Sequence, residues 1–158
     1  MIDTFTEILK ASQKHYKVYA VETIVALWEF CITVIRTETK VLTQPYVKAN
    51  ALELMTLFIY TDEKKELTPE LSKSPVISRT LMDTVLKFYV DIEFAGQGMF
   101  FTKFQFRHSC SQVFRRFWTG EAYRKQVREQ VGQEYFERFL NCLINDMTYC
   151  LEEGIAKL

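Results

Sequence analysis

The stretch Tyr135-Phe-Glu-Arg-Phe-Leu-Asn-Cys-Leu-Ile-Asn-Asp-Met-Thr-Tyr-Cys-Leu151 decides the fold. Its apolar residues recur at spacings of four, three, four and four, the period of one helix face: Phe136, Leu140, Leu143, Met147 and Leu151. A second seam runs beside the first and contains Phe139, Cys142, Asp146 and Cys150. A stripe this wide can contact two neighbouring elements. We therefore predict a core helix, and no residue on it has the partners that catalysis needs.

The composition favours a single helical domain over residues 1–158. Hydrophobic residues make up 48% and charged residues 25% of the 158 positions, as in ordinary globular chains. Aromatic residues are frequent, at 15%, which favours a heavily packed interior. Only 5 glycines and 3 prolines occur, too few for the many turns of a β-sandwich or barrel. The predicted fold class is therefore all-α.

Charge and cysteine content exclude several classes of function. The formal net charge is zero, so no global field draws the chain to nucleic acid or to a membrane. The four cysteines show no CxxC spacing and no paired histidine, so we expect neither zinc nor another cofactor. Free, buried thiols in a reducing compartment are expected instead. The start Met1-Ile-Asp-Thr lacks signal-peptide character, which predicts a cytoplasmic or nuclear protein.

Apolar periodicity predicts roughly six helical segments in series, as in an armadillo-like helical repeat or solenoid. The segment 4–13 is short and amphipathic, and 16–35 is the most apolar run of the chain. Lys17, Glu22 and Glu29 interrupt that run, so a buried helix is a better interpretation than a membrane span. Further helices are expected over 45–60, 75–92, 103–118 and 123–130, with a charged linker at 62–74 in which helical order could survive only in short pieces. The apolar face expected for the helix over 75–92 is Ile77, Leu81, Val85, Phe88 and Ile92.

Helix signals support these boundaries. Pro45 and the pair Ser74-Pro75 are typical of first helical turns. Gly120 stands at the stop position after the helix that ends at Trp118. Gly132 separates the short helix from the final one.

Several dispersed motifs between residues 44 and 157 resemble the core region of the ubiquitin-chain elongation factors, the large U-box ubiquitin ligases also called ubiquitin conjugation factor "E-four". The residues that carry this resemblance are Gln44-Pro-Tyr-Val-Lys-Ala49, Lys87-Phe-Tyr-Val-Asp-Ile-Glu93 with Gly96, Lys103-Phe104, Arg107, Phe117-Trp118, Arg138-Phe139, Leu143-Ile-Asn-Asp146 and Leu151-Glu-Glu153.

The resemblance implies that the parent protein extends ubiquitin chains on already modified substrates. It implies two partners, a ubiquitin-conjugating enzyme and the AAA-type segregase, besides the polyubiquitinated substrates. A carboxy-terminal U-box would bind the conjugating enzyme without a covalent intermediate, and nothing like it occurs in this sequence. We therefore expect a non-catalytic scaffold fragment, part of a longer protein and inactive alone.

Few residues are candidates for chemistry. His108 and Cys110 suggest a base and a nucleophile, but residues two apart on a helix point about 200° away from each other. Asp146 interrupts an apolar seam and needs a buried partner, for which Arg107 is the candidate. Asp91 and Glu93 are expected to brace the loop after Gly96 rather than to bind metal. The sequence predicts no catalytic, cofactor or metal site.

Seven basic residues against one acid, Glu121, lie between 103 and 128. The candidate interaction face taken from this segment comprises Arg115, Arg116, Arg124, Lys125 and Arg128. Such a face could dock an acidic protein or a phosphate backbone, or could simply be solvated. Two alternatives therefore stay open: an armadillo-like adaptor unrelated to ubiquitin, and a helical nucleic-acid-binding protein. Because the chain is neutral, we expect neither nucleic-acid nor membrane binding.

Overall fold

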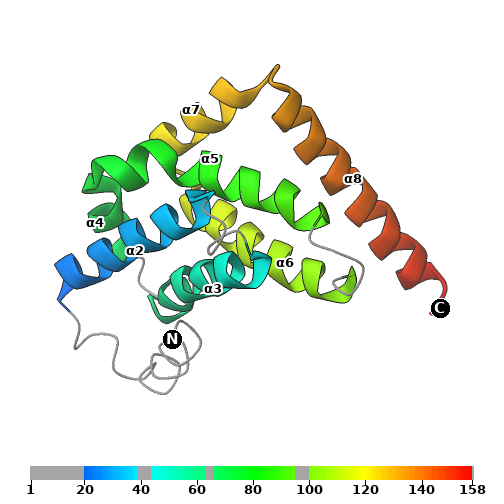
Figure 1. The fold of residues 1–158 in the computed structure, drawn as a ribbon, viewed down its shortest axis with the longest axis horizontal. Helices are drawn as coiled ribbons and strands as arrows, with labels where there is room; N and C mark the ends of the chain where they lie inside the picture. The colour runs from blue at the N-terminus through cyan, green and yellow to red at the C-terminus, as the bar shows by residue number, and fades with distance from the viewer. Residues whose placement is uncertain (1–19, 39–43, 63–65, 95–99, 158) are drawn as a thin grey trace.

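The computed structural model describes residues 20–38, 44–62, 66–94 and 100–157, and it confirms the all-α fold class. These residues contain no strand (Figure 1). The helices are α2 (Val21–Arg36), α3 (Pro45–Thr61), α4 (Leu67–Lys73), α5 (Pro75–Asp91), α6 (Phe100–Phe117), α7 (Glu121–Gln130) and α8 (Glu134–Ile155), with a 3-10 turn, η2 (Ile92–Phe94). The armadillo-like repeat stays a prediction. The predicted segment 4–13 lies outside the described residues.

Helix α5 lies at the centre of the molecule and contacts α2, α4, α6, α7 and α8 (Figure 1). It begins as the sequence predicts, because the Ser74 hydroxyl accepts a hydrogen bond from the backbone N–H of Ile77 at 3.2 Å and Pro75 occupies the first turn. The whole predicted face is buried: Ile77, Leu81, Val85, Phe88 and Ile92. Burial of this face on several neighbours at once holds the fold together.

Helices α2, α3 and α6 complete the core. Trp28 of α2 is fully buried, and its ring centroid lies 5.5 Å from that of Phe117 at the end of α6. Leu52 of α3 is equally buried. Among the described residues no helix is long and apolar enough to cross a membrane. The described part of the most apolar run, α2, buries Ile24, Trp28, Cys31, Ile32, Val34 and Ile35.

The predicted linker at 62–74 is wrong, because part of it is folded into the core. Leu67 and Leu71, four residues apart, form the buried face of the short helix α4. The buried Asp62 carboxylate accepts hydrogen bonds from the backbone N–H groups of Glu66 at 2.9 Å and Leu67 at 3.1 Å, which would otherwise lack partners. The high charge content of this segment suggested an exposed linker, but one of its charged residues, Asp62, is itself buried.

The two corners that flank α7 use glycine for different reasons. Gly132 has a φ of +87°, a left-handed conformation that favours glycine, and it makes the sharp turn into α8 as predicted (Figure 1). Gly120 is not the left-handed stop residue that the sequence predicts, since its φ is −79°. A Cβ atom at Gly120 would lie 2.7 Å from the Tyr123 ring, so glycine is needed there for close approach.

Helix α8 departs most from the prediction. Asp146 is its one buried residue, and Leu140, Met147 and Leu151 of the predicted core face are exposed. Phe139 and Cys142 of the second seam, and Leu143 of the first, are partly buried against the core. The prediction that the first seam lies in the core is therefore wrong for Leu140, Met147 and Leu151, because α8 runs along one edge of the molecule (Figure 1).

Candidate functional site

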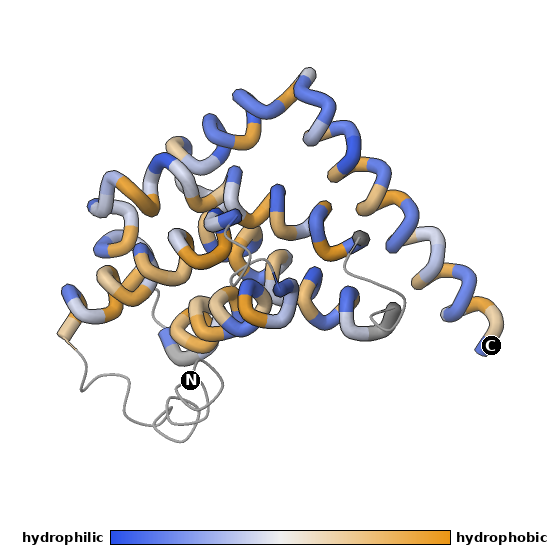
Figure 2. The backbone as a smooth tube through the Cα atoms, in the orientation of Figure 1, coloured by the Kyte–Doolittle hydropathy of each residue, from blue (hydrophilic) through white to orange (hydrophobic). Residues whose placement is uncertain are grey.

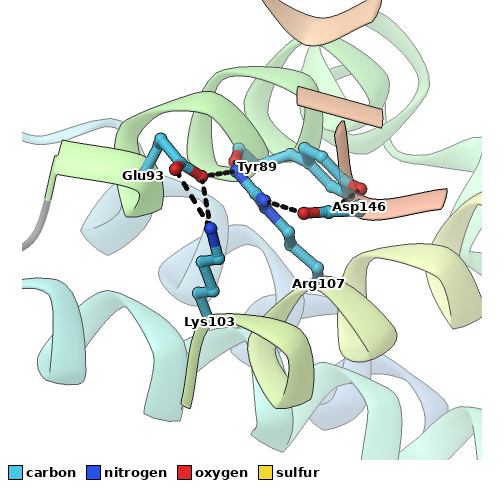
Figure 3. Close-up of polar contacts among 5 residues, drawn as sticks. All are labelled: Tyr89, Glu93, Lys103, Arg107 and Asp146. Atoms are coloured by element: carbon cyan, nitrogen blue, oxygen red, sulfur yellow. Dashed lines mark hydrogen bonds and ion pairs between the residues drawn. The ribbon is translucent and has the colours of Figure 1, made fainter. Parts of the chain in front are cut away.

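A buried polar network joins α5, α6 and α8, and its centre is the guanidinium of Arg107 (Figure 3). Arg107 lies on α6 and its side chain is only 4% exposed. One of its nitrogens, Nη1, lies 2.6 Å from Asp146 Oδ1 of α8. The other, Nη2, lies 2.7 Å from Glu93 Oε2 in η2. The structure thus confirms that Arg107 is the partner of Asp146.

Tyr89 of α5 completes the contacts of both charged groups (Figure 3). Its hydroxyl donates a hydrogen bond of 2.7 Å to Asp146 Oδ2, and its backbone carbonyl accepts from Arg107 Nε and Nη2 at 3.3 Å. The guanidinium carbon also lies 4.6 Å from the centroid of the Tyr89 ring, within the range of a cation–π contact. Asp146 therefore has a separate partner for each of its oxygens.

Glu93 binds two cationic side chains of α6. Lys103 Nζ lies 3.0 Å from one Glu93 oxygen, and Arg107 contacts the other. Burial alone would raise the pKa of Glu93, but the hydrogen bond from Lys103 and the charge of Arg107 outweigh it and lower the pKa. Burial alone would lower the pKa of Arg107, but the charges of Asp146 and Glu93 raise it. Part of the loop after Gly96 lies outside the described residues.

Asp91 has a bracing contact of its own. Its Oδ1 accepts a hydrogen bond from the Tyr135 hydroxyl of α8 at 3.2 Å. Burial is the largest cause that raises the pKa of Tyr135, and Asp91 adds to it. Asp91 therefore ties the end of α5 to the start of α8.

The network is arranged for structure rather than for chemistry. Each of its charged groups contacts others of the network. No group of three or more possible metal ligands occurs among the described residues. Breaking a buried pair by removing one partner costs about 3–5 kcal/mol. Its chemical effect is thus to fix α8 against α5 and α6.

The cysteines and His108 do not assemble a nucleophilic site in the described residues. Burial raises the pKa of Cys110, whose side chain is fully inaccessible, and raises that of Cys31 to about 12. A buried thiol with a raised pKa is a poor nucleophile. His108 is exposed on α6, where the Tyr60 hydroxyl lies 3.3 Å from its Nε2. As predicted, His108 and Cys110 do not meet.

All four cysteines are free, but the prediction that they are buried holds for only two of them. Cys142 is partly exposed. Cys150 lies on the exposed part of α8. Both belong to the second seam of α8, which is at least partly buried from Phe139 to Asp146 and exposed at Cys150.

The predicted basic face is reduced by pairing. Arg116 points away from this face, because its side chain is only 9% exposed, pairs with the buried Asp62 and donates from Nε to Thr68 Oγ1 at 2.7 Å. Arg124 and Arg128 both contact Glu121, and Lys125 lies 3.8 Å from Glu129. Arg115 is exposed on α6. The four other residues stay a predicted interaction face. Much of their charge is neutralised by Glu121 and Glu129. The sequence shows where these acids are but not which basic residues they contact.

Sequence reasoning missed one buried ion pair. Asp62 and Arg116 connect the α3–α4 turn to α6, and Arg116 also donates to the Asp62 carbonyl at 2.9 Å. No periodic signal marks this pair, because the two residues lie 54 positions apart in charged surroundings. One signal for this pair is present in the sequence. Asp62 follows the predicted helix over 45–60 and lies a few residues before α4, where a carboxylate can accept hydrogen bonds from the first backbone N–H groups of a helix.

Together, the fold and the polar network define an all-helical structural module whose charged interior fixes helices in place. Comparison with known proteins identifies the family: residues 1–158 match the model of the ubiquitin elongating factor core. The chain therefore belongs to the ubiquitin elongating factor core family. The match also includes the first 43 residues, for which no motif was recognised.

Relatives from yeasts and a plant support this membership. The chain is 29% identical over 99% of its length to "Ubiquitin conjugation factor E4" of Schizosaccharomyces pombe, covering 16% of that protein. It is 30% identical over 72% of its length to "Probable ubiquitin conjugation factor E4" of Arabidopsis thaliana, covering 12%. It is 26% identical over 82% of its length to "E4 ubiquitin-protein ligase UFD2" of Saccharomyces cerevisiae, covering 14%. No solved structure gives a significant match.

Proposed function

We propose that this chain is a non-catalytic scaffold segment of a ubiquitin-chain elongation factor that acts in ubiquitin-dependent protein degradation. The observation that carries the proposal is the family match over all 158 residues, together with relatives whose names place them in ubiquitin conjugation. The chain covers only 16% of the S. pombe relative, so ligase activity belongs to the proposal for the whole protein.

The geometry favours a structural over a catalytic part in that activity. A ligase that carries ubiquitin as a thioester needs an accessible thiol of depressed pKa. Three of the four cysteines do not meet this need: Cys31 and Cys110 are buried with raised pKa values, and burial also raises the pKa of Cys142, whereas Cys150 is exposed. The buried side chains around Arg107 connect three helices, which is a structural role.

The proposed partners are those of the parent protein. They are a ubiquitin-conjugating enzyme bound through a U-box, the AAA-type segregase, and polyubiquitinated substrates. The proposed location is the cytoplasm, the nucleus or both. What supports these assignments is the family of the relatives, and the chain's contribution is to hold the longer protein in shape.

The first test uses the chain alone. Added to ubiquitin, activating enzyme and conjugating enzyme, it is expected to leave the length and rate of ubiquitin chains unchanged, while the S. pombe relative extends them. A ubiquitin adduct on any of the four cysteines that disappears with reducing agent would contradict the proposal. So would accelerated chain growth by the chain alone.

A second test replaces the matched segment of the S. pombe relative with this chain. If the segment is a scaffold, the hybrid protein is expected to elongate ubiquitin chains whenever thermal unfolding shows that it is folded. A hybrid that unfolds cooperatively near the temperature of the parent and yet fails to elongate would indicate a direct role in the reaction.

We propose that the reduced basic face, Arg115, Arg124, Lys125 and Arg128, is a weak contact surface for an acidic protein segment. Its nearby acids Glu121 and Glu129 lower the positive potential of this face, so its attraction to an acidic segment is weak and its attraction to a phosphate backbone is weak for the same reason. Little duplex DNA binding is therefore expected at physiological ionic strength. Salt-sensitive binding with a log–log slope of about 0.9 per phosphate contact, lost when the four charges are reversed, would favour the nucleic-acid alternative.

A further inference from the structure

Helix α8 carries an apolar surface that no described part of the chain covers. Leu140 is 41% exposed, Ile144 59%, Met147 58% and Leu151 64%, whereas Leu143, on the side nearer the core, is partly buried. We call this surface the α8 stripe, and it consists of Leu140, Ile144, Met147, Leu151 and Ile155. Hydrophobic residues recur along the length of α8, while the helix lies at the edge of the molecule (Figure 2).

The α8 stripe has the spacing of a helix-packing seam. Its first four residues are separated by four, three and four positions, the alternation found where two helices pack side by side. From Leu140 to Ile155 it is about 22 Å long at 1.5 Å per residue, or four helical turns. Scattered exposed apolar residues need no explanation, whereas a contiguous row of this kind marks a contact surface.

The stripe lies between the inner face and the polar face of α8. At 100° per residue, Phe139 and Asp146 of the inner face lie on one side of it. Glu137 and Glu152 lie on the other side, together with Asn141 and Thr148. Within the described residues no cation pairs with Glu137 or Glu152, whereas Glu134 and Glu153 contact Arg138 and Lys157. The open border of the stripe is therefore acidic.

The acidic border favours some binding partners of the α8 stripe over others. A second copy of α8 would bring like charges together along the seam, which is unfavourable. An amphipathic helix with an apolar row and with lysine or arginine opposite Glu137 and Glu152 would complement both features. The source of such a helix is suggested by length, since the matched S. pombe relative extends far beyond the 16% that this chain covers.

We infer that, in the longer proteins of this family, the α8 stripe packs against a further amphipathic helix of the same polypeptide. That helix has an apolar row with basic residues on its flanks. The inference deepens the proposed scaffold function and rests on it. The stripe joins this segment to the remainder of the scaffold, and the polar network around Arg107 holds α8 at the angle at which the stripe is presented.

Cysteine labelling tests this inference independently of any ubiquitin reaction. Ile144→Cys places a thiol on the stripe and Asn145→Cys places one on the polar face, each in a chain carrying Cys142→Ser and Cys150→Ser. Both positions are exposed in the structure, so a maleimide reagent is expected to label them at comparable rates. The same pair is then made at the matching positions of the S. pombe relative.

In the S. pombe relative, the thiol matching Ile144 is expected to react at least about tenfold more slowly, as for a site reached only by local opening. The thiol matching Asn145 is expected to keep its rate. Equal rates at both positions would overturn the inference. Protection in this chain alone that grows with protein concentration would also overturn it, in favour of a second copy.

Two further arms complete the test. Protection in the relative that develops only after conjugating enzyme or segregase is added would assign the stripe to a separate partner and overturn the inference. If the Ile144 variant of the relative does not fold, Leu151→Cys provides a second reporter on the same stripe. The readout is labelling and not activity, so the two proposals can fail separately. If the stripe is protected in the relative while the folded hybrid protein is inactive, this inference stands and the proposed function fails.

Discussion

Helices α5 and α8 are both long and amphipathic, yet one is buried on nearly every side and the other is held at the edge. Nine of the 17 residues of α5 are buried, against one of the 22 residues of α8, and that one is a carboxylate. Apolar packing fixes α5. Polar contacts near Arg107 and three aromatic contacts among the described residues fix α8. Phe139 lies 5.1 Å from Tyr89 and 6.0 Å from Phe114, and Tyr149 lies 5.1 Å from Phe104, between ring centroids.

This difference shows that periodicity identifies a helix without identifying what covers it. Both helices show a row of apolar residues at helical spacing. Helix α5 contacts five other helices, whereas in α8 most of the equivalent row is exposed and the adjacent seam carries much of the packing. The stability of α8 therefore depends on a few specific polar and aromatic contacts, and that of α5 on buried apolar area.

The largest expected effect separates the two helices directly. Leu81→Ala in α5 removes a fully buried side chain and is expected to lower the free energy of unfolding by about 3 to 4 kcal/mol, as for other buried leucines. Leu151→Ala in α8 is the matched control and is expected to cost under about 0.5 kcal/mol, because its side chain is mostly exposed. Urea unfolding measures both. Equal losses would mean that the contrast between the helices is wrong.

The burial of α5 could be predicted from the sequence, whereas the orientation of α8 could not, for physical reasons. The α5 face was predicted in full, because Ile77, Leu81 and Val85 continue without interruption after the Ser74-Pro75 start. For α8 the sequence offered two seams of comparable apolarity. The seam that contains Asp146 seemed the poorer one, but a charged residue can be buried when a partner such as Arg107 reaches it, and this decides the orientation of α8.

The candidate site was predictable only in part. Arg107 and Asp146 could be paired from one buried carboxylate and one arginine on another amphipathic helix. The participation of Tyr89 through its hydroxyl, its ring and its carbonyl could not, since a tyrosine on an apolar face is ordinary in a core. The neutralisation of Arg124 and Arg128 by Glu121 also required three-dimensional contacts, because side chains of one short helix have several possible partners.

The next largest effect is expected from the polar attachment of α8. Asp146→Ala leaves the buried Arg107 with Glu93 as its remaining carboxylate and is expected to cost about 3 kcal/mol, the lower end for a broken buried pair. Hydrogen exchange is expected to rise in α8 more than in α5, because the lost contacts are those that attach α8. Asn145→Ala, one residue away on the polar face, is the control. A uniform rise in both helices would show that α8 is no separate unit.

Acid is expected to weaken the same network by a smaller amount. The folded-state pKa of Glu93 is lowered, so its contribution is present above the unfolded value of about 4.3 and is lost as the pH falls through the folded value. Melting temperatures between pH 7 and pH 3 are expected to decline more steeply for the natural chain than for Glu93→Gln, which has no carboxyl to protonate at this position. Parallel curves would remove Glu93 from the set of contacts that stabilise the fold.

The smallest expected effect lies on the open side of α8. Met147→Ser removes an apolar side chain that is 58% exposed, so the free energy of unfolding is expected to change by no more than about 0.5 kcal/mol. Met82→Ser is the matched change in α5, where the side chain is fully buried, and it is expected to cost at least about 2 kcal/mol. Thermal and urea unfolding of the two variants compare the helices with one residue type and one replacement. A loss above about 1.5 kcal/mol for Met147→Ser exceeds what an exposed methionine contributes. It would mean that the α8 stripe is already covered in the isolated chain, and α8 would then resemble α5 in how it is held.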